Sequence, residues 1–287
     1  MSIDVLQDKI RKKKNPSLIQ LEAFSELIPE SVLADNGSLA AACKAYYCAL
    51  LEGLKNTVPA VRIDRGSFSL LGVEGLTAFA CIARTAKDLG YYVITDLPQL
   101  LSPAAAKNAA LCLAEDDCFD GYVAGAYLGS DVLRHLVQLC KSGKSLFAVV
   151  RTSNKSAVEL QDLLTGGRLV HTAAADVVYR HGETLGGKFG YSQLAAMAAA
   201  GSVDSLRTLR SRYAKLFLLV DGYDYPNGNA KNCSHAFDRF GHGAVVCAGA
   251  SITAAWKEAE GECAYVEAAL AAAEKMKKNL VRYVNIL

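Results

Sequence analysis

Tyr91-Tyr92-Val93-Ile94-Thr95-Asp96 is the stretch of sequence from which the fold can be worked out. Its β-branched and aromatic residues follow the helix-stop signal Asp88-Leu89-Gly90, so they predict a short buried strand. In barrels and doubly wound α/β folds the residues just past the carboxyl ends of strands carry the chemistry, which places Asp96 where a catalytic carboxylate is expected. The residues that follow, Leu97-Pro98-Gln99-Leu100-Leu101, supply no base, cation, metal ligand or phosphate-binding glycine.

Short apolar runs of this kind alternate with amphipathic helical runs at a spacing of roughly thirty residues, which is the length of a βα unit. The predicted strands are Ser17–Glu22, Val58–Asp64, Tyr91–Asp96, Phe119–Ala124, Ser145–Arg151, Gln193–Ala198, Leu216–Val220 and Ala244–Cys247. Helices are expected from Leu39, over Val132–Cys140 and over Ala264–Tyr283. We therefore predict an α/β fold, a single (β/α)8 TIM barrel over residues 1–287 with an N-terminal helix. A doubly wound open sheet is the alternative, but no Gly-x-Gly-x-x-Gly follows the first strand.

The composition is that of a globular chain with a large core, since 52% of the 287 residues are hydrophobic and 21% are charged. The net charge is +2, and the basic run Lys9–Lys14 predicts the solvated face of a first helix rather than nucleic-acid binding. The nine cysteines are scattered without a Cys-x-x-Cys, which favours a reducing compartment. The sequence also contains no long apolar run, so we expect a cytoplasmic protein that does not bind membranes. The dispersed histidines, among them His171, predict surface or helix-end positions and no metal site.

Several motifs, in order along nearly the whole chain, resemble the orotidine 5'-phosphate decarboxylases of the longer bacterial subfamily. They are Asn15-Pro-Ser-Leu-Ile-Gln-Leu-Glu22, Lys55-Asn-Thr-Val-Pro-Ala-Val-Arg62, Leu71-Gly-Val-Glu-Gly-Leu76, Tyr127-Leu-Gly-Ser130, Arg151-Thr-Ser-Asn154, Leu160-Gln-Asp-Leu163, Val220-Asp-Gly-Tyr223 and Gly243-Ala-Val-Val246. The resemblance implies a (β/α)8 barrel that dimerises through its open end. It also implies decarboxylation of orotidine monophosphate to UMP without any cofactor.

The resemblance further implies a Lys-Asp-Lys-Asp charge array at the ends of the second and third strands. In this sequence the first lysine falls at Arg62, the first aspartate is kept as Asp96, the central lysine falls at Pro98 and the last aspartate at Leu101. The central lysine would protonate the carbon that loses carbon dioxide and would place a cation beside the developing carbanion. Proline has no side-chain proton to give, and an arginine has a pKa too high for easy proton donation.

The other substrate contacts that the resemblance implies are altered as well. Glu22 and Asp64 replace an aspartate and a glutamine of the family pattern, and Thr152-Ser153-Asn154 lies where the family touches the pyrimidine. In the two loops expected to hold phosphate, around Gly222 and Gly249, Ala250 stands where an arginine is expected and Asp221 and Asp224 have been added. Carboxylates there would repel a phosphate dianion. The alternative to a role of Asp96 in the site is a structural role, as a helix cap or as a partner of Arg62. For Arg65 and Arg151 the alternative is solvation at the surface.

Three functions remain open from the sequence. The first is a non-catalytic homologue with a binding, regulatory or structural role, whose mouth takes a nucleotide or other small polar ligand. The second is an enzyme of different chemistry built on Glu22, Arg62, Asp64 and Asp96, and the third is an active decarboxylase. We expect a homodimer across the barrel mouth, with the loop Leu97–Pro103 at the interface and Leu97, Leu100 and Leu101 forming an exposed apolar cluster.

Overall fold

The computed structural model describes residues 2–98, 100–259 and 264–287, so Gln99 and Cys263 lie outside the described residues. Its eight long strands form a closed barrel in the order β1-β10-β9-β8-β5-β4-β3-β2. They are β1 (Ser17–Leu21), β2 (Ala60–Ile63), β3 (Tyr92–Asp96), β4 (Gly121–Gly125), β5 (Ser145–Val149), β8 (Leu194–Ala199), β9 (Leu218–Asp221) and β10 (Ala244–Ala248). Every predicted strand is confirmed, and no boundary differs by more than two residues. Because β1 pairs in parallel with both β2 and β10, the ring is closed and the open-sheet alternative is wrong.

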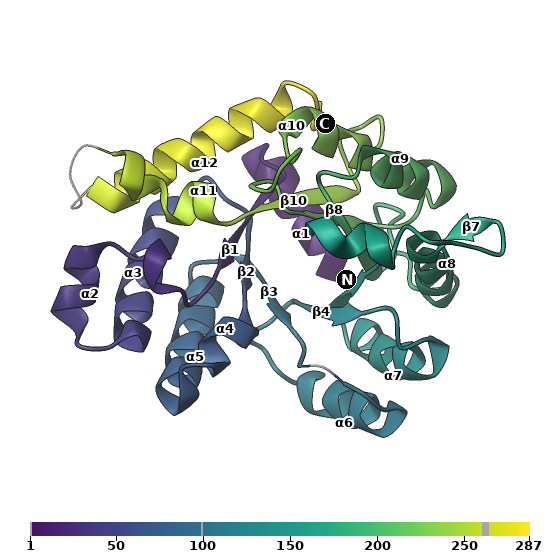
Figure 1. Ribbon diagram of the computed structural model, residues 1–287, viewed down its shortest axis with the longest axis horizontal. Helices are drawn as coiled ribbons and strands as arrows, with labels where there is room; N and C mark the ends of the chain where they lie inside the picture. Colours follow the sequence, from purple (N-terminus) through teal and green to yellow (C-terminus); the bar gives the residue numbers. More distant parts are fainter. Residues whose placement is uncertain (1, 99, 260–263) are drawn as a thin grey trace.

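Helices surround the barrel in the alternating order that the sequence predicts (Figure 1). They are α1 (Ser2–Lys13), α2 (Glu30–Asn36), α3 (Leu39–Leu54), α4 (Arg65–Ser69), α5 (Gly72–Asp88), α6 (Pro103–Leu113), α7 (Ser130–Lys141), α8 (Val170–Gly182), α9 (Val203–Arg212), α10 (Ala230–Cys233), α11 (Ala250–Thr253) and α12 (Tyr265–Val281). The predicted cap of α3 is present, since the Ser38 side chain accepts a hydrogen bond from the backbone N–H of Ala41. The small hairpin of β6 (Leu164–Thr165) and β7 (Arg168–Leu169), between β5 and α8, was not predicted from the sequence.

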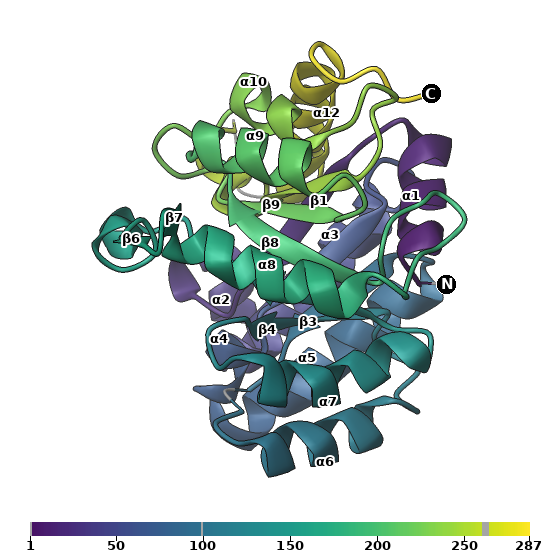
Figure 2. The ribbon, with the colours of Figure 1, turned by 90° about the vertical axis from the view of Figure 1, so that its right-hand side faces the viewer.

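The core has two layers because side chains alternate along each strand. One layer lies between the strands and the helices and contains Ile19 and Val61. The other fills the barrel, where Leu18 and Tyr92 pack with Ile3 of α1. Figure 2 shows α1 at one end of the barrel and the β6–β7 hairpin at the other. Helix α1 thus closes the amino ends of the strands, and the carboxyl ends form an open mouth.

Among the described residues, no helix has the length and apolar character needed to cross a bilayer.

Candidate active site

The mouth of the barrel is built by the residues that end β1, β2, β3 and β9. Alternation along each strand decides which of them point inward: Ala60, Ile94 and Leu219 belong to the cluster that fills the barrel. Two residues further along, the same inward face carries Arg62, Asp96 and Asp221. Parallel pairing brings these strand ends to one level, as in the register that sets Gln20 against Arg62.

Arg62 is the centre of a hydrogen-bonded ion network. Its Nη2 donates to Asp96 Oδ1 at 2.6 Å, and its Nε lies 3.2 and 3.3 Å from the two carboxylate oxygens of Asp96. The Nη1 atom donates to Gln20 Oε1 at 3.1 Å and to Asp221 Oδ1 at 3.3 Å. The three charged side chains are 11%, 20% and 17% exposed for Arg62, Asp96 and Asp221, so little water competes for these contacts. The pairing of Asp96 with Arg62 that the sequence suggested is therefore present.

Burial and charge act in opposite directions on this network. Burial lowers the pKa of the Arg62 guanidinium, but the negative charges around it, above all Asp96, raise that pKa by more. Burial raises the pKa of Asp96, and the Arg62 charge opposes this shift. Burial also raises the pKa of Glu22, while its hydrogen bond from Gln20 Nε2 at 2.7 Å lowers it. Arg62 is consequently a permanent cation that has no proton to give near neutral pH.

A cleft of about 350 Å³ opens above Arg62 at the mouth. Its lining includes Glu22, Gly222, Asp224, Gly249 and Ala250. Asp224 closes one side, because its Oδ2 accepts the backbone N–H of Gly249 at 2.6 Å and that of Ser251 at 3.2 Å. Loops after the seventh and eighth barrel strands commonly bind phosphate, and here a carboxylate already occupies the N–H groups of the second loop.

The remaining predicted contacts divide into two groups. Ser153 joins the mouth, since its hydroxyl donates towards Asp221, with the backbone oxygen at 3.0 Å and Oδ2 at 3.1 Å. Thr152 and Asn154 instead bond to each other at 2.6 Å, and Gln161 of the same loop donates to the Thr152 hydroxyl at 2.8 Å. The Thr152 hydroxyl and Asn154 Oδ1 are thus engaged within that loop.

Asp64 has a structural task. It caps α4 by accepting the backbone N–H groups of Gly66 and Ser67 at 3.3 and 2.9 Å.

Pro98 and Leu101 lie away from the charged cleft. Pro98 lines a separate, largely apolar groove with Leu97, Leu100 and Tyr127. The expectation of an exposed cluster of three leucines is wrong: Leu97 and Leu100 are half-buried against the core, and Leu101 is 70% exposed.

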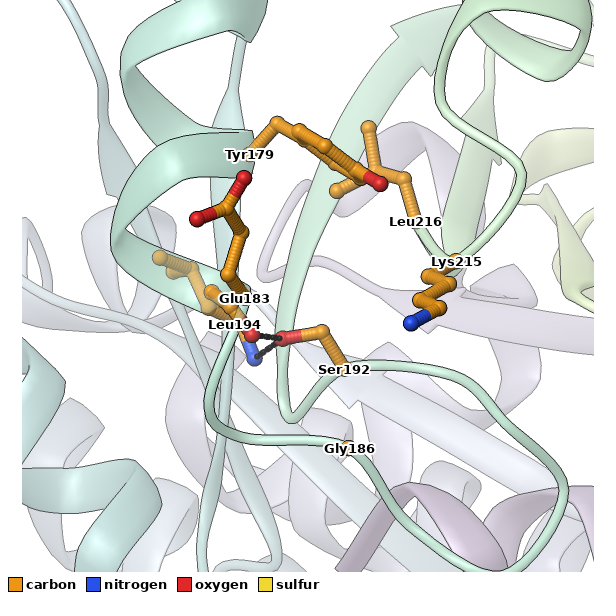
Figure 3. Close-up of a pocket in the computed structure, with 8 residues that line it drawn as sticks. Tyr179, Glu183, Gly186, Ser192, Leu194, Lys215 and Leu216 are labelled. Carbon is orange, nitrogen blue, oxygen red and sulfur yellow. Dashed lines mark hydrogen bonds between the residues drawn. The ribbon is translucent and has the colours of Figure 1, made fainter.

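A further hollow, of about 170 Å³, lies at the amino ends of β8 and β9, opposite the mouth (Figure 3). Glu183 and Lys215 lie on different sides of it, and the Ser192 hydroxyl bonds to the backbone of Gly182 and Leu194 at 2.9 and 3.1 Å. Residues at this end of a barrel usually contribute to stability rather than to chemistry.

In the described part of the chain, one group of side chains has the spacing of metal ligands: Asp116, Asp117 and Cys118, ahead of β4. Exposed acidic groups of this kind are common without an ion, and this one lies at the amino end of the barrel, away from the cleft.

Comparison with known proteins identifies the family. The chain is 30% identical over 231 residues to an orotidine 5'-phosphate decarboxylase of Rhodopirellula baltica, which covers 78% of this chain and 76% of that protein. The chain belongs to the orotidine 5'-phosphate decarboxylase family. It is also 26% identical over 284 residues to the Clostridium novyi enzyme of that name, covering 98% of each chain. No family model matches the chain.

Solved structures of the decarboxylase family share the fold. An OMP decarboxylase of Leishmania donovani superposes with a TM-score of 0.70 at 21% identity, over 96% of this chain and 98% of that one. The orotidine 5'-monophosphate decarboxylase of Plasmodium berghei gives 0.73 at 11% identity, over the same shares. These neighbours confirm the TIM barrel.

Asp221 and Asp224, which the sequence placed in the phosphate loops of this decarboxylase-family chain, also make contacts at the mouth that the sequence did not predict. Asp221 ends β9 as Asp96 ends β3, so the same signal, an acid at a strand end, could have placed it beside Arg62. Asp224 sits in the loop beyond, and only the folded backbone shows that it reaches Gly249. Arg151, expected to be solvated, is instead 6% exposed and paired with Asp162.

Proposed function

We propose that this chain is a non-catalytic member of the decarboxylase family whose mouth binds a small polar ligand that carries no phosphate dianion. The observation that carries the proposal is the state of Arg62. It is the one cationic side chain among the described residues that line the cleft, and Asp96 and Asp221 hold it. Its raised pKa leaves it unable to protonate a carbanion.

The resemblance places the proton donor and its charged neighbour at Pro98 and Leu101. Neither side chain can supply a proton or a charge, and Pro98 lines an apolar groove rather than the cleft. Losing one preorganised group in a catalytic site commonly costs about 2.7–4 kcal/mol in the transition state. Losing several leaves little turnover even when the effects are not additive.

Phosphate binding is opposed by the same geometry. Asp224 holds the N–H groups of Gly249 and Ser251 at 2.6 and 3.2 Å, so a phosphate would have to displace a carboxylate that is already bonded there. Two negative charges about 4 Å apart repel by roughly 4 kcal/mol at an effective dielectric constant of about 20. Binding energy from the phosphate is therefore not available for transition-state stabilisation.

We further propose a homodimer across the mouth. Most of the exposed large apolar side chains of the described residues lie in the loops and helix starts that follow a barrel strand, which is the mouth side: Phe24, Leu70, Val73, Leu76, Leu101, Tyr127, Leu128, Val158, Leu160, Leu163, Leu164 and Tyr225. Exposed apolar side chains gathered on one side of a molecule are typical of a contact surface.

The test measures turnover and binding together. Purified protein is incubated with orotidine monophosphate and the fall of orotate absorbance is followed, with an active relative assayed in parallel as positive control. We expect a rate at least about 10³-fold below a typical kcat near 10 s⁻¹, and no rescue in Pro98→Lys because the phosphate contacts remain absent. Calorimetry should show that UMP binds no more tightly than uridine. Turnover within about tenfold of 10 s⁻¹ would refute the proposal and favour an active decarboxylase.

A further inference from the structure

A second cluster of reactive side chains lies outside the mouth, between the loop after β5 and the starts of α8 and α9. His171 Nδ1 lies 3.1 Å from Asp162 Oδ1, and His171 Nε2 lies 3.2 Å from Ser205 Oγ. A hydroxyl within reach of an imidazole, which is itself oriented by a carboxylate, is the geometric signature of an activated nucleophile. These three residues play no part in the function proposed above.

The hydrogen bonds determine which nitrogen of His171 carries the proton. Nδ1 faces two oxygen atoms, Gln161 O at 3.0 Å and Asp162 Oδ1 at 3.1 Å, and neither can donate when the carboxyl is ionised. Nδ1 of the neutral ring must then be the donor, which leaves Nε2 as the acceptor. Ser205 Oγ consequently donates to Nε2 and accepts from Ser202 Oγ at 2.7 Å. The ring is thus in the tautomer that a general base requires.

The cluster opens into a pocket of about 460 Å³, whose lining includes Asp162, His171, Ser202 and Ser205. His171 is 2% exposed and Ser205 is 5% exposed, and both residues line this pocket. Figure 2 shows α8 and α9 on the same side of the barrel, with the β6–β7 hairpin at one end of α8. A pocket of this size accommodates a short acyl chain and no macromolecule.

Ser205 also lies beside hydrogen-bond donors that could hold an oxyanion. It is in the first turn of α9, a helix of ten residues, and the side chain of the N-cap Ser202 makes no capping bond. The first N–H groups of a helix have no partner within the helix, and its dipole favours negative charge there. Backbone N–H groups at such a place can stabilise the oxyanion of a tetrahedral intermediate.

We propose that Ser205, His171 and Asp162 form a second, nucleophilic site that transfers short acyl groups from small carboxylic esters to water. Ser205 Oγ forms a bond to the carbonyl carbon as its proton moves to His171 Nε2. The bond to the alcohol then breaks, and the alcohol leaves with that proton. Water next attacks the acyl-serine, gives its proton to Nε2 and releases the carboxylic acid, while the proton returns to Ser205.

Asp162 acts as a positioning residue. Arg151 binds both of its oxygens, Nε to Oδ1 and Nη2 to Oδ2, each at 2.9 Å. Because this cation already neutralises the carboxylate, Asp162 orients the imidazole more than it strengthens it as a base. We therefore expect slow acyl transfer.

The full-length protein is tested with a small fluorophosphonate, which a nucleophilic serine attacks so that an O–P bond forms, the P–F bond breaks and the proton moves to Nε2. Mass spectrometry locates the adduct, and p-nitrophenyl acetate hydrolysis provides a second readout. We expect one adduct per chain on Ser205 and none in Ser205→Ala. The labelling rate should rise with pH and should fall about 10²-fold or more in His171→Gln. Ser211→Ala, an exposed serine on the same helix, serves as the matched control and should label like wild type.

A purely structural role predicts the opposite pattern. The variants would then lower the melting temperature and leave labelling and ester hydrolysis unchanged. The proposal is overturned if the Ser205 peptide is recovered without adduct, or if His171→Gln labels at the wild-type rate. Should His171→Gln fail to fold, the adduct site in wild type and the pH dependence of its rate still decide between the two roles.

Discussion

Replacing Arg62 with methionine tests the ion network at the mouth. Methionine keeps much of the volume of the side chain but removes the charge that Asp96 and Asp221 share. Breaking a buried ion pair by removing one partner typically costs about 3–5 kcal/mol, because the other charges stay buried without compensation. At about 2 °C per kcal/mol for a chain of this size, we expect Tm to fall by about 6–10 °C at neutral pH.

The loss should depend on pH with a definite sign. Burial already raises the pKa of Asp96 above its ordinary value, and removing Arg62 removes the charge that opposes this shift. A carboxyl whose pKa is raised on folding destabilises the folded state above that pKa, and the cost disappears as the pH falls through the folded pKa towards the unfolded value. The gap between the variant and wild type should therefore be smaller at pH 5 than at pH 7.

The matched control is Arg84→Met, because Arg84 pairs with Asp117 on the surface, where the two side chains are 53% and 77% exposed. Its Tm should stay within error of wild type. Melting curves followed by circular dichroism at both pH values provide the measurement. A fall of less than about 2 °C for Arg62→Met, or a fall that does not change with pH, would show that the network contributes little to stability.

Three further predictions concern the mouth. Asp224→Asn should raise the affinity for UMP relative to uridine by about tenfold or more in calorimetry, because it removes the charge at Gly249; an unchanged ratio would contradict the phosphate argument. Gly222→Ala should lower Tm by several degrees, because φ is +81° and a Cβ would lie 2.4 Å from Ser153 Oγ. The control Gly37→Ala should lower Tm clearly less, because Gly37 has φ +69° but open space around it. Leu101→Glu should shift the proposed dimer towards monomer in light scattering, while a wild-type protein that is monomeric at high micromolar concentration would contradict the dimer.

The strands could be predicted because their signal is local. A buried parallel strand is a short apolar run, and Tyr92–Asp96 or Ala244–Ala248 can be recognised without knowing its neighbours. Arg62 and Asp96 could be placed together for a related reason, since carboxyl ends of parallel strands meet at one edge.

Contacts that depend on loop paths could not be predicted. Asp224 reaches Gly249 across 25 residues, and His171 meets Ser205 across 34, with no periodicity that links the partners. The burial of Leu97 was missed for the same reason, because it depends on how the loop after β3 folds back onto the core. His171 was correctly expected at a helix end, at the start of α8, but its burial at 2% exposure follows from α9 packing beside it.

Under the proposed function, the mouth of this barrel keeps the fold of a catalytic family while its charges are used differently. Enzymes accelerate reactions through charges that are preorganised for the transition state and left incompletely satisfied in the ground state. Here Arg62 donates hydrogen bonds to Asp96, Asp221 and Gln20, and Asp224 accepts hydrogen bonds from Gly249 and Ser251. Charges that satisfy one another stabilise the resting protein and leave little field for a developing carbanion. A lysine introduced at Pro98 would lie in a neighbouring apolar groove, beside a network whose charges are already paired with one another. We therefore expect that single change to restore a charge without restoring catalysis.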